Sequence, residues 1–401
     1  MSNRQGATIK LYDNDSHEKE FTALVRSCVS SGDFFKVELD RTAFFPEGGG
    51  QYADTGVLVV GEGADGGIEI EVTDVQIEDK VIYHFVKTAI AEGTQVVGKL
   101  NWDERFLRMQ NHTGEHIISG LIHSTFGYEN IGFHLGDDDV TCDYNGALNW
   151  EQIKMIEAAA NAAVFRNIEI KTEYPDPEKL PELQYRSKLD LTEDVRLVTI
   201  PGVDCCACCA PHVKYTGEVG LIKIVNHEKS HGGTRLHIRC GFLALADYDE
   251  KQDNILRIVD LLSARQYETA DCVEQLMATN GKLTHELAKA SKAIAEAKLS
   301  ALDVVEGNLV VCLEHADTDA LRALANGGKD KCTGVFVALT ETDGGYRYMI
   351  TGNGIPLSKL SKEFNALLVG RGGGKDDMLQ GVFASALPVI EDFFENWSYS
   401  E

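Results

Sequence analysis

The sequence predicts an α+β protein built from four parts, and three observations support that class. Runs rich in β-branched and aromatic residues dominate the first hundred residues, irregularly alternating helical and extended segments continue to about residue 247, and residues 248–302 are helical. A regular alternation of strand and helix would indicate a parallel sheet, so the irregular order favours α+β. The last part, residues 303–401, alternates again and predicts a small α/β domain.

Residues 1–100 are predicted to form a small β-barrel. Short runs of this composition, bounded by turn residues, are typical of strands, and several at this spacing favour a closed or strongly twisted sheet. The glycine-rich residues 61–67 are expected to form a hairpin connection. The predicted strands cover residues 33–40, 56–60, 68–77, 80–87 and 94–100.

Residues 101–247 are predicted to form an α+β domain that opens with a long amphipathic helix. From Asp103 to about Gly127, Phe106, Met109, Ile117, Leu121 and Phe126 have the spacing of an apolar stripe. Beyond this helix we expect one more, at residues 151–165. Extended segments are expected at residues 133–143, 168–173, 195–200, 221–225 and 235–240.

Residues 248–302 are predicted to form a helical hairpin. Apolar positions from Leu283 to Ala301 alternate steps of four and three, which indicates a coiled-coil-like seam. The polar residues 266–271 are expected to turn the chain between two antiparallel helices. Asn280-Gly281 is either a second break or a glycine tolerated within the helix at a cost of ~1 kcal/mol. The seam suits packing within the chain, or a homodimer through the helical and C-terminal regions.

Residues 303–401 contain a glycine-rich segment, expected to be a loop. We expect strands at residues 309–313, 335–339 and 346–351 and helices at 318–326 and 359–368. The segment comprises Arg371, Gly372, Gly373, Gly374 and Lys375. It is one residue short of a P-loop and lacks the following Ser/Thr, so an ATP-independent protein is expected. A backbone-amide nest for RNA phosphate is the favoured interpretation.

Charge and hydropathy limit the partners and the compartment. The chain has 38 Lys and Arg against 63 Asp and Glu, a net charge of −25. Residues 205–240 nevertheless hold five basic against two acidic residues, and residues 355–375 four against one. These islands suit salt-dependent RNA binding. No apolar run approaches the ~20 residues of a membrane span, and no secretory signal opens the chain. We expect a cytoplasmic protein with no membrane partner.

Two pairs of side chains, each with i,i+4 spacing, predict a metal site. His112 and His116 fall on one face of the first helix, about a turn apart. Cys208 and His212 follow the Pro201-Gly202 turn and are also four residues apart. Nitrogen and sulfur ligands together suit Zn²⁺, so we predict one zinc ion per chain.

The same helix also fits a metallopeptidase. Its His-x-x-Glu-His order is the inverzincin arrangement, in which Glu115 would be the general base and Glu193 a downstream acidic ligand. That alternative leaves the cysteine cluster and the C-terminal half unexplained.

Four segments resemble the editing portion of alanyl-tRNA synthetase and its freestanding relatives, the long AlaX-type alanyl-tRNA editing proteins. Three of them are RTAFFPEGGGQYADTG (residues 41–56), RMQNHTGEHIISGLIH (108–123) and CCAPHVKYTGEVGLIKI (208–224). VGRGGGKDDMLQG (369–381) is similar to the glycine-rich stretch of the synthetase's C-terminal domain. The aminoacylation domain is absent from this sequence.

The resemblance implies a hydrolase that deacylates tRNA-Ala carrying serine, or glycine, and so acts as an editor without charging activity. A second hydrolytic site that requires the hydroxyl completes a double sieve. By matching positions, the zinc ligands are His112, His116, Cys208 and His212. Thr42 matches a threonine that contacts the serine hydroxyl. Gly48, Gly49, Gly50 and Gln51 match a GGQ-like loop. The resemblance implies catalytic roles for Thr42 and Gln51 and tRNA contacts for the three glycines, although by composition the glycines suit a turn equally well.

The sequence departs from the family pattern at the cysteines. The usual C-G-G-T-H is here Cys208-Cys209-Ala210-Pro211-His212, preceded by Cys205 and Cys206, so the thiolate ligand stays open, with Cys208 favoured by its spacing. Glu115 is either a base for the attacking water or a solvated helix residue. A non-catalytic protein that binds tRNA or zinc is the third interpretation.

Overall fold

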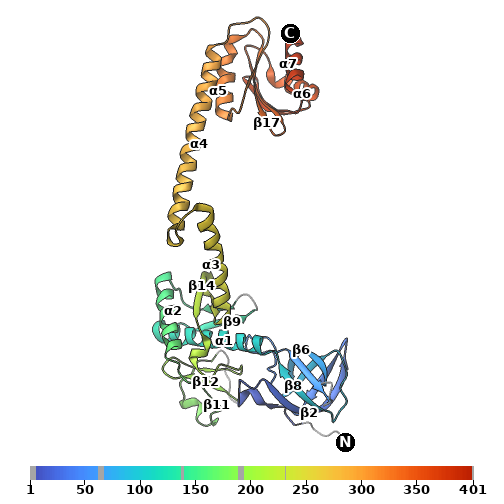
Figure 1. Ribbon diagram of the computed structural model, residues 1–401, viewed down its shortest axis with the longest axis vertical. Coiled ribbons are helices and arrows are strands. Elements are labelled where there is room, and N and C mark those ends of the chain that lie inside the picture. Colours follow the sequence, from blue (N-terminus) through green and yellow to red (C-terminus); the bar gives the residue numbers. More distant parts are fainter. Residues whose placement is uncertain (1–5, 62–66, 137–139, 188–193, 231, 400–401) are drawn as a thin grey trace. The chain divides into compact units, whose positions relative to one another are not determined.

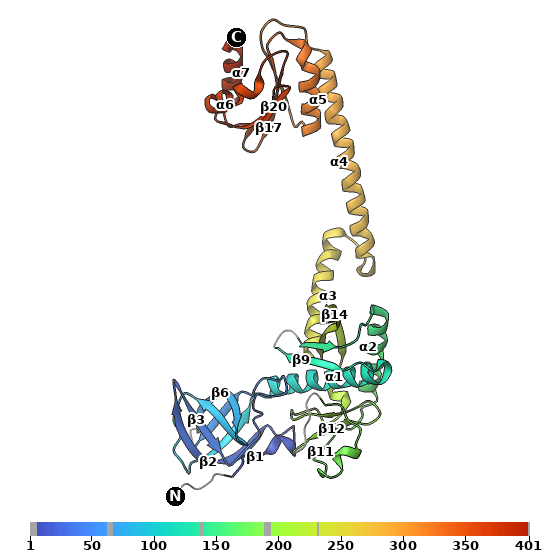
Figure 2. The ribbon, with the colours of Figure 1, turned by 180° about the vertical axis from the view of Figure 1, so that it is seen from behind.

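The chain divides into two compact units, Met1–Asn254 and Ile255–Glu401 (Figures 1 and 2). The computed structural model describes residues 6–61, 67–136, 140–187, 194–230 and 232–399. The α+β class and the N-terminal barrel are confirmed. Among the described residues, no helix has the length and apolarity that crossing a bilayer requires.

The barrel closes in the strand order β2-β3-β7-β6-β5-β8. Its longest strand, β2, was not predicted, because serine, arginine and glutamate obscure an alternation in which Phe21, Ala23 and Val25 point into the core. The short strands β1 (Ile9–Lys10) and β4 (Arg41–Thr42) pair outside the barrel. The barrel strands are β2 (Glu20–Ser31), β3 (Phe34–Leu39), β5 (Gly56–Val60), β6 (Ile68–Glu78), β7 (Val81–Val86) and β8 (Gln95–Leu100).

A fully buried histidine lies in the barrel core. His84 Nδ1 is 3.1 Å from the Val37 carbonyl, which can only accept, so Nδ1 carries the proton. His84 Nε2 therefore accepts from the Thr42 hydroxyl at 2.8 Å. Burial lowers the pKa of His84 to about 4, since charging the ring would cost its hydration.

Helix α1 (Trp102–Phe126) confirms the predicted long helix and ends at Gly127, whose φ of 70° is left-handed. The five residues of the predicted apolar stripe belong to or pack against one hydrophobic core, but the opposite side of the helix is not exposed as expected. Every residue from Arg108 to Gly120 is buried, while Phe106, Leu121 and Phe126 are only half-buried. Figures 1 and 2 explain this, because α1 runs between two sheets. Polar side chains in the middle of α1 are therefore enclosed on all sides.

The two sheets around α1 have the orders β14-β15-β10-β9 and β11-β12-β13. The extended stretch expected at residues 133–143 is two antiparallel strands. Helix α2 (Trp150–Phe165) begins with a capping box from Asn149 and Gln152 and packs against α1. The strands are β9 (Asn130–Leu135), β10 (Val140–Tyr144), β11 (Lys171–Glu173), β12 (Leu197–Ile200), β13 (Asp204–Ala207), β14 (Ile222–Ser230) and β15 (Gly233–Cys240).

Two long helices follow, α3 (Phe242–Leu262) and α4 (Thr269–Ser300), with a 3-10 turn at Gln266–Glu268. Of the two alternatives for Asn280-Gly281, the tolerated glycine is confirmed, because α4 continues through it. The antiparallel packing of the two helices stays a prediction. The end of α4 packs closely on α5 (Thr318–Gly328), where a Cβ on Gly327 would lie 2.2 Å from Leu299.

The C-terminal sheet has the order β16-β17-β18-β20-β19. The glycine-rich loop predicted here is wrong, because Gly370–Lys375 is the edge strand β19. A nest is excluded as well, since successive amides of an extended strand point to opposite sides. The other elements are β16 (Leu309–Leu313), β17 (Val335–Thr342), β18 (Gly345–Gly352), β20 (Met378–Phe383), α6 (Leu357–Leu367) and α7 (Leu387–Asn396).

The glycines of β19 permit close packing. A Cβ on Gly372 would lie 2.3 Å from the carbonyl oxygen of Gln380 and 2.5 Å from the Tyr348 hydroxyl. A Cβ on Gly370 would meet Asn365 of α6 at 2.8 Å. The glycine pattern that resembled a phosphate-binding loop is therefore accounted for by contacts with β20, β18 and α6.

The buried neutral His84 makes barrel stability depend on pH. Below about pH 6.5 the unfolded chain binds a proton that the native ring binds only near pH 4, so the free energy of unfolding falls as the pH drops through this window. The shift amounts to about 3 kcal/mol. We expect the opening free energy of β3 and β7, measured by hydrogen exchange and corrected for intrinsic exchange, to fall by about this amount between pH 7 and pH 4.

His84→Gln is expected to flatten this pH dependence, and exposed His285→Gln in α4 is the matched control. An equally steep dependence in His84→Gln would contradict the account.

Candidate metal centre

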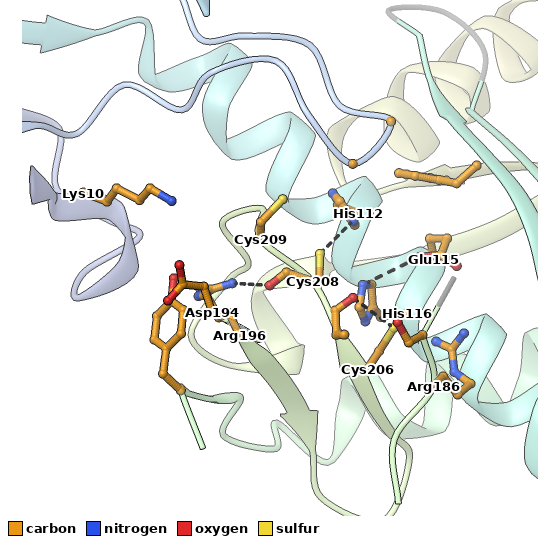
Figure 3. A pocket seen from close by; sticks show the side chains of 16 residues that line it. Lys10, His112, Glu115, His116, Arg186, Asp194, Arg196, Cys206, Cys208 and Cys209 are labelled. Carbon is orange, nitrogen blue, oxygen red and sulfur yellow. Dashed lines mark hydrogen bonds and ion pairs between the residues drawn. The ribbon is translucent and has the colours of Figure 1, made fainter. Parts of the chain in front are cut away.

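Four side chains from two segments converge at the middle of α1, and Figure 3 shows three of them, His112, His116 and Cys208. His112 and His116 lie one turn apart on α1, and the ring of His212 lies 4.8 and 4.5 Å from theirs, centroid to centroid. Cys208 Sγ is 3.6 Å from His112 Nε2 and 3.5 Å from His212 Nε2. All four ligand atoms lie within 4.8 Å of one another. The structure thus brings together the four side chains expected to bind metal.

The strand β13 separates the four clustered cysteines. Its side chains alternate, so Cys206 faces α1 while Cys205 faces Thr199, 3.4 Å away. Cys209 is exposed. Cys206 belongs to an overlapping group with His116 and Asp204, but among the described residues only the Cys208 sulfur joins all three histidines. This geometry favours Cys208, as its spacing did.

Each imidazole has an outer hydrogen-bond partner. His112 Nδ1 donates to Gln51 Oε1 at 2.9 Å, and His116 Nδ1 donates to Asp204 Oδ2 at 3.1 Å. His212 Nδ1 lies 3.1 Å from the Thr113 hydroxyl. These bonds turn the Nε2 atoms of the three rings toward Cys208. Outer partners of this kind orient histidines that bind metal.

Electrostatics at the cluster suit a cation. Burial raises the pKa of Cys208, but hydrogen bonds and charge from the histidines outweigh it, so its pKa lies well below that of a free thiol. Burial also lowers the pKa of His212 to about 3. Burial acts in the same direction on His116, but hydrogen bonds to Asp204 and Cys208 outweigh it and hold the pKa of His116 well above its usual value. A metal ion binds a thiolate and neutral imidazoles, so it would take the place of the His116 proton, and three nitrogens with one sulfur fit Zn²⁺.

A cavity of about 410 Å³ opens onto this cluster. Its walls include Phe133, Glu115 and Arg186 beside the histidines, with Gly49 and Gly50 on the barrel side. Such a volume suits a small organic group rather than a folded polymer.

Glu115 is buried in this cavity, so its interpretation as a solvated helix residue is wrong. Its Oε1 accepts from the Ser119 hydroxyl and from Asn130 Nδ2, both at 2.5 Å. Its Oε2 lies 3.9 Å from His116 Nε2. The carboxylate is thus fixed beside the cluster. Glu193, the acidic ligand that a metallopeptidase would need, lies outside the described residues.

The loop from β4 to barrel strand β5 reaches the cluster through Gln51. Gly50 has a φ of 82°, and a Cβ there would lie 2.8 Å from the Phe133 carbonyl oxygen, so glycine is required. The Gly50 carbonyl accepts from Leu135 of β9. Gly48 closes the turn through reciprocal main-chain bonds with Gln51. Gln51 therefore holds a histidine in place.

Thr42 is not brought to this cavity. It is fully buried, and its hydroxyl donates to His84 and accepts from the Phe44 amide at 3.1 Å. Its contact with a substrate hydroxyl stays a prediction.

Sequence reasoning gave no role to several residues of the site. Asp204 directly precedes the clustered cysteines. In a strand it would share a face with Cys206, and this spacing was the signal that could have placed it at the site. Arg186, Thr113 and Asn130 carried no signal, because their partners are distant in the sequence.

The basic island at residues 205–240 is largely neutralised by acidic residues from elsewhere. Counting charges along the sequence therefore misjudged the surface of this segment. The ion pairs are Lys214–Asp15, Lys223–Glu157, Arg235–Asp143 and Arg239–Asp247, at 2.8, 2.5, 2.8 and 3.1 Å.

Two segments of the chain match known protein families. Residues 195–259 match the family model described as threonyl and alanyl tRNA synthetase second additional domain, and residues 3–104 match that of class II (A) tRNA synthetases. The C-Ala domain of Aquifex aeolicus alanyl-tRNA synthetase has 19% identity and a TM-score of 0.20, covering 22% of this chain and 87% of that domain.

Two curated relatives match most of the chain. The alanine–tRNA ligase of Ignicoccus hospitalis is 29% identical over 408 residues, covering 96% of this chain but only 42% of the ligase. The alanyl-tRNA editing protein AlaX-L of Pyrococcus horikoshii is 30% identical over 387 residues, covering 93% of this chain and 94% of that protein. The resemblance that the motifs indicated is confirmed, and the chain belongs to the AlaX-L family of alanyl-tRNA editing proteins.

Proposed function

We propose that this protein is a trans-acting editing hydrolase that removes serine, or glycine, from mischarged tRNA-Ala with the help of one zinc ion. The observation that carries the proposal is the cluster of His112, His116, Cys208 and His212, which lies in a cavity beside the buried carboxylate of Glu115. Membership of an editing family supports the tRNA-Ala substrate.

The chain's own residues divide into ligands and positioning groups. His112, His116, Cys208 and His212 would hold the zinc ion, which when bound can polarise an ester or lower the pKa of a water molecule to ~7. Gln51, Asp204 and Thr113 orient the three imidazoles from outside. Gln51, for which the family resemblance implies a catalytic role, thus acts through a ligand.

Glu115 is the candidate proton acceptor. Its carboxylate is held by Ser119 and Asn130 and lies next to the ligand His116, so it can take a proton from water that attacks the ester. The same water activation would serve a peptidase, but a Cys208 ligand is expected only for the editing site.

The tRNA body requires a second contact, and the C-terminal unit is the candidate. Arg371 and Lys375 are exposed on β19 and can pair with RNA phosphates. A homodimer through α4 and this unit also stays a proposal.

Deacylation tests the function directly. We expect the protein to hydrolyse Ser-tRNA-Ala much faster than Ala-tRNA-Ala. The reason is that an editing site must spare the correct product. Gly-tRNA-Ala is assayed as the second candidate substrate. Release of labelled amino acid measures the rates, and peptide cleavage without ester hydrolysis would favour the metallopeptidase. Binding of tRNA with no hydrolysis would favour the non-catalytic alternative.

Removing one metal ligand tests the zinc site. We expect about one zinc per purified wild-type chain by mass spectrometry of the metal, and substoichiometric zinc with lost activity in Cys208→Ala. Cys205→Ala is the matched control, because Cys205 faces Thr199 on the other side of β13. Equal zinc contents in the two variants would sink the assignment.

The role of Gln51 can be separated from catalysis. Since outer partners of a metal-bound histidine contribute about 10–100-fold to metal affinity, Gln51→Leu is expected to weaken zinc binding by that factor. Activity is expected to return when zinc is saturating. Lost activity at unchanged zinc affinity would instead assign Gln51 to the chemical step.

A further inference from the structure

An arginine that the sequence did not single out shares the cavity with the metal cluster. Arg186 lines the same walls as Glu115, His116 and Cys206, and Figure 3 shows these side chains grouped on one side of Cys208. The segment that carries it is fixed to β13, because the Arg186 amide donates to the Cys205 carbonyl at 2.8 Å and its own carbonyl accepts from the Ala207 amide at 2.9 Å.

The guanidinium is held in one orientation by a buried carboxylate. Its Nε and Nη2 donate to the two oxygens of Asp204, each at 2.8 Å, and the Asp204 side chain is 1% exposed. Asp204 Oδ2 also accepts from His116. One carboxylate therefore fixes both a metal ligand and the arginine, so the two move together.

This pairing leaves the third nitrogen of the fork for another acceptor. Arg186 Nη1 donates to no residue that the structure describes, and it is not among the enclosed polar atoms that lack a partner. By contrast, the cavity residue Arg196 uses its Nη1 on the carbonyls of Cys208 and Ala210, at 3.0 and 2.9 Å. Arg186 is thus a prepositioned donor facing the cavity.

A fixed cationic donor is most useful where negative charge develops during the reaction. When water adds to an ester, an electron pair of the carbonyl bond moves onto the carbonyl oxygen, and prepositioned donors lower the energy of that state more than they stabilise the neutral ester. The neutral hydroxyl of a seryl substrate would be stabilised less by a cationic donor than the developing oxyanion is.

We propose that Arg186 is a further catalytic residue, which donates from Nη1 to the carbonyl oxygen of the aminoacyl ester; this inference rests on the proposed deacylase function. The water oxygen bonds to the carbonyl carbon while Glu115 takes its proton, and negative charge collects on the oxygen facing Arg186. The pair then returns, the bond to the ribose oxygen breaks, and that oxygen takes the proton from Glu115. The products are the free amino acid and the uncharged tRNA.

Single-turnover deacylation of Ser-tRNA-Ala and Gly-tRNA-Ala tests this role. We expect Arg186→Gln to slow both by about 100-fold, the usual loss of one such donor, and Arg186→Lys, which keeps a charge for Asp204, to slow both as well. Zinc content, Tm and the Kd for a non-hydrolysable seryl-amide tRNA are expected to change little.

Arg235→Gln is the matched control. Arg235 makes the same two-bond pair with Asp143, through Nε and Nη2 at 2.8 Å each, but it lies on β15 and does not line the cavity. Its rate is expected to equal that of the wild type.

Each other outcome overturns the proposal in a distinct way. Loss confined to the seryl substrate would assign Arg186 to the serine hydroxyl, and weaker binding of the amide analogue at an unchanged rate would assign it to the tRNA. If Arg186→Lys lowers the zinc content or the Tm enough to account for the lost activity, Arg186 has a structural role. An inactive wild type would reject the deacylase function itself before any variant is compared.

Discussion

The structure depends on the enclosure of polar side chains on a helix that has no solvent-facing side in its middle. An unpaired buried polar group costs free energy, so each one along α1 needs a partner. These partners come from Gln51 of the barrel loop, Asp204 of β13 and His212. On the other side, Asn111 accepts from the Cys240 amide of β15 at 2.9 Å. The hydrogen bonds that satisfy the polar side chains of α1 therefore bring the four candidate ligands together and join the barrel to both sheets.

Close approach of the two sheets to α1 depends on its glycines. A Cβ on Gly114 would lie 2.3 Å from the Cys240 sulfur, and one on Gly120 would lie 2.4 Å from the Val203 carbonyl oxygen. A side chain at Gly114 would displace the Cys240 side chain, and one at Gly120 would displace the backbone at the start of β13. Helix propensity is reduced at both glycines, but packing compensates for that loss. The site is thus rigid because its supporting elements touch at backbone distance, which favours prepositioned catalysis.

The unusual Cys-Cys-Ala-Pro-His segment keeps the ligand geometry while changing its surroundings. Ala210 is fully buried in the barrel core cluster, and its carbonyl accepts from Arg196. The segment is therefore anchored between ligands Cys208 and His212 by the barrel. Cys205 faces Thr199, and Cys206 and Cys209 line the cavity without joining the three histidines, so the four-residue cluster contains one cysteine although four lie within five residues.

Local sequence patterns determined most of the elements and which four side chains converge as candidate ligands. The period of α1, the strand composition of the barrel and the i,i+4 spacings of His112–His116 and Cys208–His212 depend on neighbours within a few residues. Tertiary structure alone decided that β19 is a strand, because its glycines are needed for close contact with Gln380 and Asn365. It also decided that Thr42 faces His84, and that Arg186 and Asp204 belong to the site. Those outcomes depend on burial and on partners that are distant in the chain, which spacing does not record.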